Sequence, residues 1–221
     1  YSPPWGGGYK SIHAWLSRDK KEGGHWCACL RIYRRKRRPV RGRIKLADRV
    51  GIDQRPKSVD SRRCFGDWEG DTIQGRLNSG VVVTLVERKS LFTVLAYSES
   101  RHAGNLNAAV VQRFSSFPML PKRTLTLDNG TEFAGHAKLA EALGVNVYFA
   151  APHAAWQRGL NENTNGLLRQ YLPKKVDLRK VPQERIAQIQ ESINNRPRKK
   201  LGYRTPAKVM AKRKITTTLH L

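Results

Sequence analysis

The apolar run GVVVTLVE at residues 80–87 constrains the fold of this chain more than any other segment. A continuous run of mostly β-branched residues at this length is typical of a strand that is buried on both faces of its sheet. Residues 65–73 and 91–97 predict strands on either side of it, and a short turn at 88–90 joins it to the later one. We therefore expect an antiparallel meander at the centre of the fold.

Helical periodicity and two further strands follow the meander. Helices are expected at residues 105–117, 132–143, 161–171 and 182–194, and strands at 124–127 and 145–149. The order β-β-β-α-β-α-β-α-α predicts the α/β class, with a mixed five-stranded sheet flanked by helices. Before the sheet, a short helix at 9–17 and a basic stretch predict a partly helical N-terminal extension.

The charge of the chain points to a polyanionic partner. Lys and Arg number 42 against 17 Asp and Glu, which gives a formal net charge of +25. Nucleic acid is favoured over an anionic membrane because no amphipathic membrane helix and no apolar run of bilayer length accompany the charge. A generally basic, solubilising surface is the simpler alternative.

The basic residues are densest between residues 31 and 49, where Pro39 and Gly42 interrupt any regular element. This composition predicts a linker that follows DNA phosphates, and a solvated linker or a localisation signal is the alternative. The residues expected to contact DNA here are Arg34, Arg35, Lys36, Arg37, Arg38, Arg41 and Arg43.

Three cysteines, Cys27, Cys29 and Cys64, form no disulfide framework and fit a reducing, cytoplasmic setting. Cys27 and Cys29 are separated by a single residue, which is poor spacing for a zinc site.

Carboxylates next to apolar strands stand out in a chain with so few acids. Asp67, Glu69 and Asp71 alternate along one predicted strand, which puts all three on one face. Asp128 follows the end of another strand, and Glu162 lies on the polar face of a predicted helix. Phosphodiester cleavage by divalent ions needs such convergent acids. Asp128 could instead be a turn former, Glu162 a solvated helix residue and Asp71 a strand-end acid. Alternation alone does not choose among Asp67, Glu69 and Asp71.

The motifs FGDWEGDTI, LTLDNGTEF, RGLNENTNGLLRQYLPK and NNRPRKKLGYRTPAKV resemble those of bacterial insertion-sequence transposases of the IS-thirty family. The resemblance covers about residues 51–212. It implies a DDE catalytic domain with the RNase H-like fold of retroviral integrases at residues 51–215. It also implies that residues 1–50 are a remnant of a helix-turn-helix DNA-binding region plus a basic linker. On that basis, we expect a chain truncated at its N-terminus.

The same resemblance implies the chemistry. Asp71, Asp128 and Glu162 would be the catalytic, metal-binding triad, and 33 residues separate the last two, as expected for the family. Two Mg²⁺ or Mn²⁺ ions would position water and then a 3′-OH, so that the enzyme nicks the insertion-sequence ends and joins them to target DNA. Apart from the resemblance, the position of Glu132 four residues after Asp128 predicts that it opens a helix at its positive end, with assistance at the metal site as a secondary role. His153 is a weak general-base candidate, and a structural or DNA-contacting histidine is the favoured alternative.

The partners implied are DNA, with a homodimer or higher oligomer forming on it, and no membrane; the location would be the bacterial cytoplasm, at the nucleoid. A nuclease of the same fold, or an inactive transposon remnant that only binds DNA, is the alternative. The further residues expected to contact DNA are Arg158, Asn161, Asn163, Asn165, Arg169, Arg196, Arg198, Lys199 and Lys200.

Overall fold

The computed structural model describes residues 9–29, 48–77, 79–152, 154, 157 and 159–218. The chain divides into two units, Tyr1–Ile44 and Lys45–Leu221. In the first unit, helix α1 (Tyr9–Lys21) precedes a short 3-10 turn, η1 (Trp26–Cys29). The helix predicted at residues 9–17 is therefore confirmed, and it continues to Lys21. The seven basic residues predicted to contact DNA between 34 and 43 lie outside the described residues.

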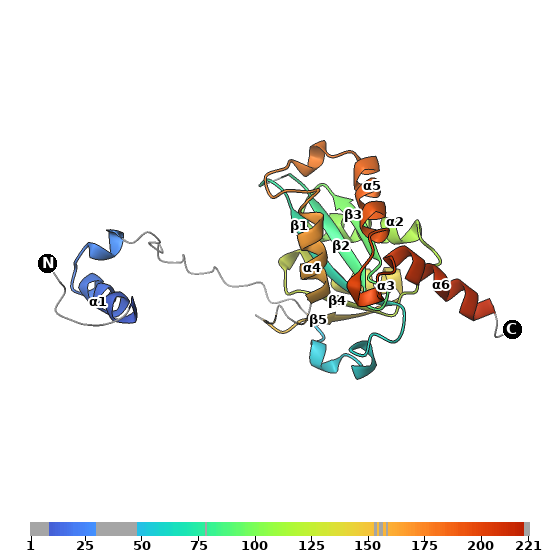
Figure 1. Cartoon of the computed structure of the whole chain (residues 1–221), viewed down its shortest axis with the longest axis horizontal. Coiled ribbons are helices and arrows are strands. Elements are labelled where there is room, and N and C mark those ends of the chain that lie inside the picture. Colours follow the sequence, from blue (N-terminus) through green and yellow to red (C-terminus); the bar gives the residue numbers. More distant parts are fainter. Residues whose placement is uncertain are drawn as a thin grey trace. The chain divides into compact units, whose positions relative to one another are not determined.

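A five-stranded mixed sheet forms the centre of the second unit, in the order β3-β2-β1-β4-β5 (Figure 1). The first three strands form the predicted antiparallel meander, and β4 and β5 run parallel to β1. All residues of β2 are buried, as its apolar run predicts. The strands are β1 (Asp67–Gln74), β2 (Val81–Glu87), β3 (Thr93–Ser98), β4 (Thr124–Leu127) and β5 (Asn146–Phe149).

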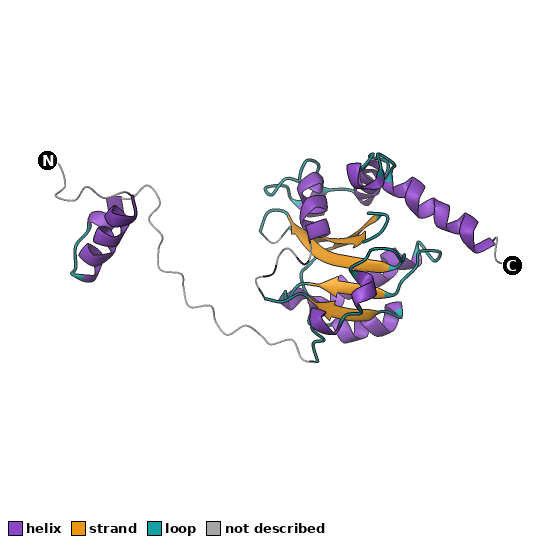
Figure 2. Ribbon diagram, turned by 60° about the horizontal axis from the view of Figure 1, so that its bottom comes forward, coloured by secondary structure: helices purple, strands orange, loops and turns teal. Residues whose placement is uncertain are grey.

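Helices cover both faces of this sheet (Figure 2). Helices α2 (Ala103–Ser115) and α3 (His136–Leu143) pack on one face, and α4 (Gly159–Leu168) and α5 (Gln183–Asn194) pack on the other. The predicted α/β class and the flanked mixed sheet are therefore confirmed.

The side chains of β1 alternate between the two faces of the sheet, so its acids point away from the core that lies beneath α2 and α3. Trp68 faces α2 and packs edge-to-face on Phe114, with ring centroids 5.1 Å apart. Ile73 faces the opposite way, into the core beneath α4 and α5. Because strand residues two apart share a face, the three acids of β1 also lie on the α4 side.

One predicted helix begins later than expected, and one helix was not predicted at all. The helix predicted at 132–143 begins only at His136, because a 3-10 turn, η4 (Thr131–Phe133), precedes it and buries Glu132 and Phe133. A helix at the C-terminal end, α6 (Pro206–Thr218), was not predicted, since its basic residues leave no clear apolar stripe (Figure 1). Further 3-10 turns within the described residues are η2 (Ile52–Gln54), η3 (Lys57–Val59), η6 (Leu178–Lys180) and η7 (Lys199–Leu201).

Two side chains of α5 cover the outer edge of β3. The Asn194 carboxamide accepts from the Thr93 N–H and donates to the Thr93 carbonyl, both at 2.8 Å. One turn earlier on the helix, Gln190 Oε1 accepts from the Leu95 N–H at 2.9 Å. An edge strand exposes unpaired backbone groups, and here side-chain amides satisfy them.

None of the helices in the described part of the chain has the length and apolar character to cross a membrane.

Candidate active site

Asp71 and Asp128 are neighbours because of the register between β1 and β4. The parallel pairing runs from Asp67 opposite Thr124 to Glu69 opposite Thr126. Two residues further along each chain, the same register puts Asp71 beside Asp128 at the end of β4, and adjacent strands lie only about 4.8 Å apart. The two aspartates therefore lie on neighbouring segments although they are far apart in sequence.

Gly70 lets these strands lie together without a steric conflict. A Cβ atom at this position would lie 2.5 Å from Cδ2 of Leu127, whose side chain is fully buried. Leu127 immediately precedes Asp128, so the glycine of the FGDWEGD motif leaves room for the residue that leads into the second aspartate.

Helix α4 lies over Asp71. The Asn165 Nδ2 donates to Asp71 Oδ2 at 2.9 Å, and Arg169, one turn later, donates to the carbonyl of Gln74 at 2.7 Å. Glu162 is exposed and lies three residues before Asn165. Residues three apart on a helix are neighbours, about 5–6 Å between Cβ atoms, so Glu162 shares the Asn165 side of α4.

The two aspartates are partly exposed, and their oxygens accept local hydrogen bonds. Asp71 Oδ1 accepts from the Thr72 N–H at 2.8 Å, and Asp128 Oδ1 accepts from the Gly130 N–H at 3.0 Å. These oxygens are the donors that Mg²⁺ prefers. As the side chains stand, however, no three His, Cys, Asp or Glu residues in the described ranges are grouped so that they could hold a metal ion. The carboxylate oxygens of Asp71 and Asp128 fit a hard cation, and a site on the predicted triad would require Glu162 to turn toward them.

Glu132 lies beside the two aspartates rather than at the start of α3. It is buried, its Oε2 pairs with Arg101 at 2.9 Å, and its Oε1 accepts from the Thr72 hydroxyl at 3.2 Å. A Cβ atom on Gly130 would lie 2.6 Å from Glu132 Oε2 and 2.9 Å from Asp128 Oδ1. Both carboxylates therefore face the same small space. The sequence signal for this placement of Glu132 was its position four residues after Asp128.

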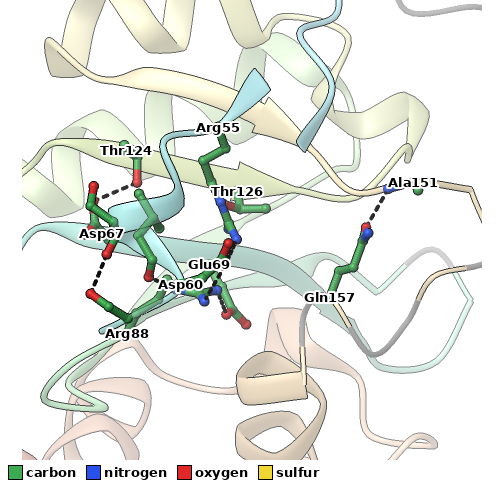
Figure 3. Close-up of polar contacts among 12 residues, drawn as sticks. Arg55, Asp60, Asp67, Glu69, Arg88, Thr124, Thr126, Ala151 and Gln157 are labelled. Atoms are coloured by element: carbon green, nitrogen blue, oxygen red, sulfur yellow. Dashed lines mark hydrogen bonds and ion pairs between the residues drawn. The ribbon is translucent and has the colours of Figure 1, made fainter. Parts of the chain in front are cut away.

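The other two acids of β1 are occupied in buried contacts (Figure 3). Asp67 and Glu69 are each only 1% exposed. Asp67 Oδ1 accepts from the Thr124 hydroxyl at 2.9 Å, and Glu69 forms an ion pair with Arg88. Burial raises the pKa of Glu69, and the charge of Arg88 opposes that rise. Of the three acids that alternation left equivalent, Asp71 is the one that solvent reaches.

The remaining predicted site residues fall into three groups. Arg158 and His153 lie outside the described residues. Asn161 is fully buried, because α4 packs on the sheet through the face that also carries Thr164 and Leu168. Arg198 is partly buried. The predicted DNA-contact residues that are exposed on the surface are Asn163, Arg196, Lys199 and Lys200.

The fold is that of an integrase-type catalytic core, which is an RNase H-like fold. The crystal structure of the catalytic core domain of BIV integrase matches this chain with a TM-score of 0.50 and 18% sequence identity. The match covers 68% of this chain and 97% of the integrase core.

Curated relatives make the resemblance specific, because they are transposases of insertion sequences. The transposase of element IS1086 from Cupriavidus metallidurans is 46% identical over 207 residues, which are 92% of this chain and 60% of that protein. Transposase InsI of element IS30A from Escherichia coli is 40% identical over 177 residues, 80% of this chain and 46% of that protein. The transposase of element IS4351 from Bacteroides fragilis is 38% identical over 202 residues, 90% of this chain and 62% of that protein.

The expected resemblance to insertion-sequence transposases is therefore confirmed. The chain spans about half to three fifths of the length of these relatives. No protein-family model matches the chain.

Proposed function

We propose that this chain carries the catalytic domain of an insertion-sequence transposase, which cuts DNA at the ends of the element and joins them to target DNA. Asp71, Asp128 and Glu162 are the catalytic carboxylates. The observation that carries the proposal is the register of β1 and β4, which makes the two aspartates neighbours under helix α4. The similarity to transposases over 80–92% of the chain supports it.

The cofactor in this proposal is a pair of Mg²⁺ or Mn²⁺ ions held by the three carboxylates. Bound there, the ions would activate the attacking oxygen of water or a 3′-OH and stabilise the leaving oxygen. The protein itself orients the ligands: Asn165 holds one oxygen of Asp71, and the Gly130 N–H holds one oxygen of Asp128. Glu132, fixed by Arg101, adds negative charge beside them.

DNA is the proposed partner, as the net charge of +25 supports. Exposed Lys199 and Lys200 would contact its phosphates. In this proposal, residues 51–215 form the catalytic domain and residues 1–50 a DNA-binding remnant with a basic linker. Two or more copies act together on DNA at the bacterial nucleoid.

Substitution of the acids tests the proposal. Asp71→Asn and Glu162→Gln should each abolish Mg²⁺-dependent strand cleavage of the element's terminal sequences and leave DNA binding within about twofold, since each change removes a ligand from the metal site only. Glu141→Gln is the matched control, because Glu141 is exposed on α3, away from the site. Unchanged cleavage in either test variant would refute the assignment.

The products of the same assay separate a transposase from a nuclease of the same fold. A transposase yields joined strands as well as nicks, whereas nicks alone would support the nuclease. DNA binding without any cleavage would instead support an inactive remnant.

A further inference from the structure

Four charged side chains form a cluster between β1, β4 and the segment that precedes β1 (Figure 3). Arg88 pairs with Glu69 and, at 3.4 Å, with Asp60. Arg55 pairs with Asp60 and donates to the Thr126 hydroxyl at 2.9 Å. Both arginines and Glu69 are buried, while the side chain of Asp60 is 62% exposed. We call these four residues the ion cluster.

Glu69 is the member of the ion cluster that contacts helix α4. Its Oε1 faces Arg88, and its Oε2 accepts from the backbone N–H of Asn161 at 3.4 Å. Asn161 lies in the first turn of α4, where backbone N–H groups have no partner within the helix. A carboxylate is favoured at this positive end of the helix.

We infer that Glu69 is a positioning residue that fixes the first turn of α4, and with it Glu162, relative to Asp71. The inference rests on the proposed function. Glu69 precedes Asp71 by two residues on the same face of β1, and its acceptor oxygen is bonded to the residue directly before Glu162. A single side chain thus links the two elements that carry two of the three catalytic acids.

The ion pair with Arg88 gives this link its rigidity. A lone buried carboxylate would be costly, so Glu69 needs the arginine as a partner in order to remain charged beneath α4. The carbonyl of Val59 accepts from the Arg88 Nε at 3.3 Å and holds the arginine in place, whereas the contact of Arg88 with the exposed Asp60 is a peripheral one of 3.4 Å. Glu69 is therefore fixed between Arg88 and the helix.

Hydrogen exchange measures the link directly. Glu69→Gln removes the charge beneath α4, whereas Asp60→Asn makes the same carboxylate-to-amide change in the ion cluster without touching the helix. Exchange of the amides at residues 159–164 should become about tenfold faster in Glu69→Gln, the scale of a well-placed charge at a helix end. In Asp60→Asn it should stay within about twofold of the unsubstituted protein.

Calorimetric titration with Mn²⁺ alone then measures the effect on the site. Mn²⁺ binding should weaken about tenfold in Glu69→Gln and by less than about twofold in Asp60→Asn, as expected if α4 loses its position relative to Asp71. A Glu69→Gln variant that matches Asp60→Asn in hydrogen exchange overturns the inference, and so does one that matches it in Mn²⁺ affinity when the unsubstituted protein binds the ion. If the unsubstituted protein binds no Mn²⁺ while exchange still rises as expected, the anchoring of α4 stands and the proposed metal site fails.

A double variant covers the case in which Glu69→Gln does not fold. Glu69→Met with Arg88→Met removes both buried charges together, a change that folded proteins often tolerate. Faster exchange at residues 159–164 in this variant supports the inference, and unchanged exchange overturns it.

Discussion

Replacing Asn194 by alanine should destabilise the second unit through the edge of β3. Asn194 is 4% exposed and makes two hydrogen bonds of 2.8 Å, one to each backbone polar group of Thr93. Alanine leaves the N–H and the carbonyl of Thr93 without a hydrogen-bond partner. Water does not replace that partner, because Thr93 is fully buried. Each unsatisfied buried group costs about 1–3 kcal/mol.

Some relaxation of the backbone at the edge of β3 reduces the combined cost of the two unsatisfied groups of Thr93. The free energy of unfolding should therefore fall by about 2–4 kcal/mol. Urea denaturation followed by circular dichroism is the assay. With a slope of about 2 kcal/mol per molar urea, the midpoint should fall by about 1–2 M while the slope stays constant.

The matched control is Asn195→Ala, the same change at the next residue, which is exposed at the end of α5. Its effect should lie within about 0.5 kcal/mol. A midpoint for Asn194→Ala that equals that of the control would refute the claim that this amide closes the edge of the sheet.

Three further changes test the packing and the electrostatics of the same unit. Gly70→Ala should lower the free energy of unfolding by about 1–3 kcal/mol, because the new Cβ would lie 2.5 Å from buried Leu127; a urea midpoint at the wild-type value would contradict this. Gly166→Ala should raise the free energy of unfolding by about 0.5–1 kcal/mol, since a Cβ in this turn of α4 meets nothing within 4 Å, and a lower melting temperature would count against it. Burial raises the pKa of the Glu87 carboxyl above its ordinary 4.5, and hydrogen bonds from Ser90, Gly66 and Lys89 oppose that rise. The folded protein therefore keeps the carboxyl proton to a higher pH than the unfolded chain does. Relative to Glu87→Gln, the wild-type free energy of unfolding should therefore fall as pH rises above 4.5, and a rise would contradict the sign.

The strands were predictable because their signals are local. The apolar run of β2 and the turn before β3 define the meander, and the pairing of these strands follows from chain proximity. The covering of β3 was not predictable. Gln190 and Asn194 share a helix face with Ile186, but their role depends on which strand ends at the edge of the sheet, and this is a property of the whole fold.

The candidate site was only partly predictable from the residues themselves. Alternation put Asp67, Glu69 and Asp71 on one face, and the resemblance to transposases chose among them. The physical difference between Asp71 and the other two acids is burial. For Glu69, burial depends on the distant segments that supply Arg55 and Arg88 to the ion cluster. Glu132 was assigned to the start of a helix because its spacing fits that helix, while its contacts with Thr72 and Arg101 arise only when distant strands come together.

The register between β1 and β4 has a consequence for how this chain tolerates changes in length. Backbone pairing brings Asp71 to Asp128, so the length of the chain between them has no direct effect on their adjacency. A peptide tag inserted beside Met119, which is 68% exposed before β4, should leave the two acids together. One residue added within β4 should instead turn Asp128 to the opposite face of the sheet.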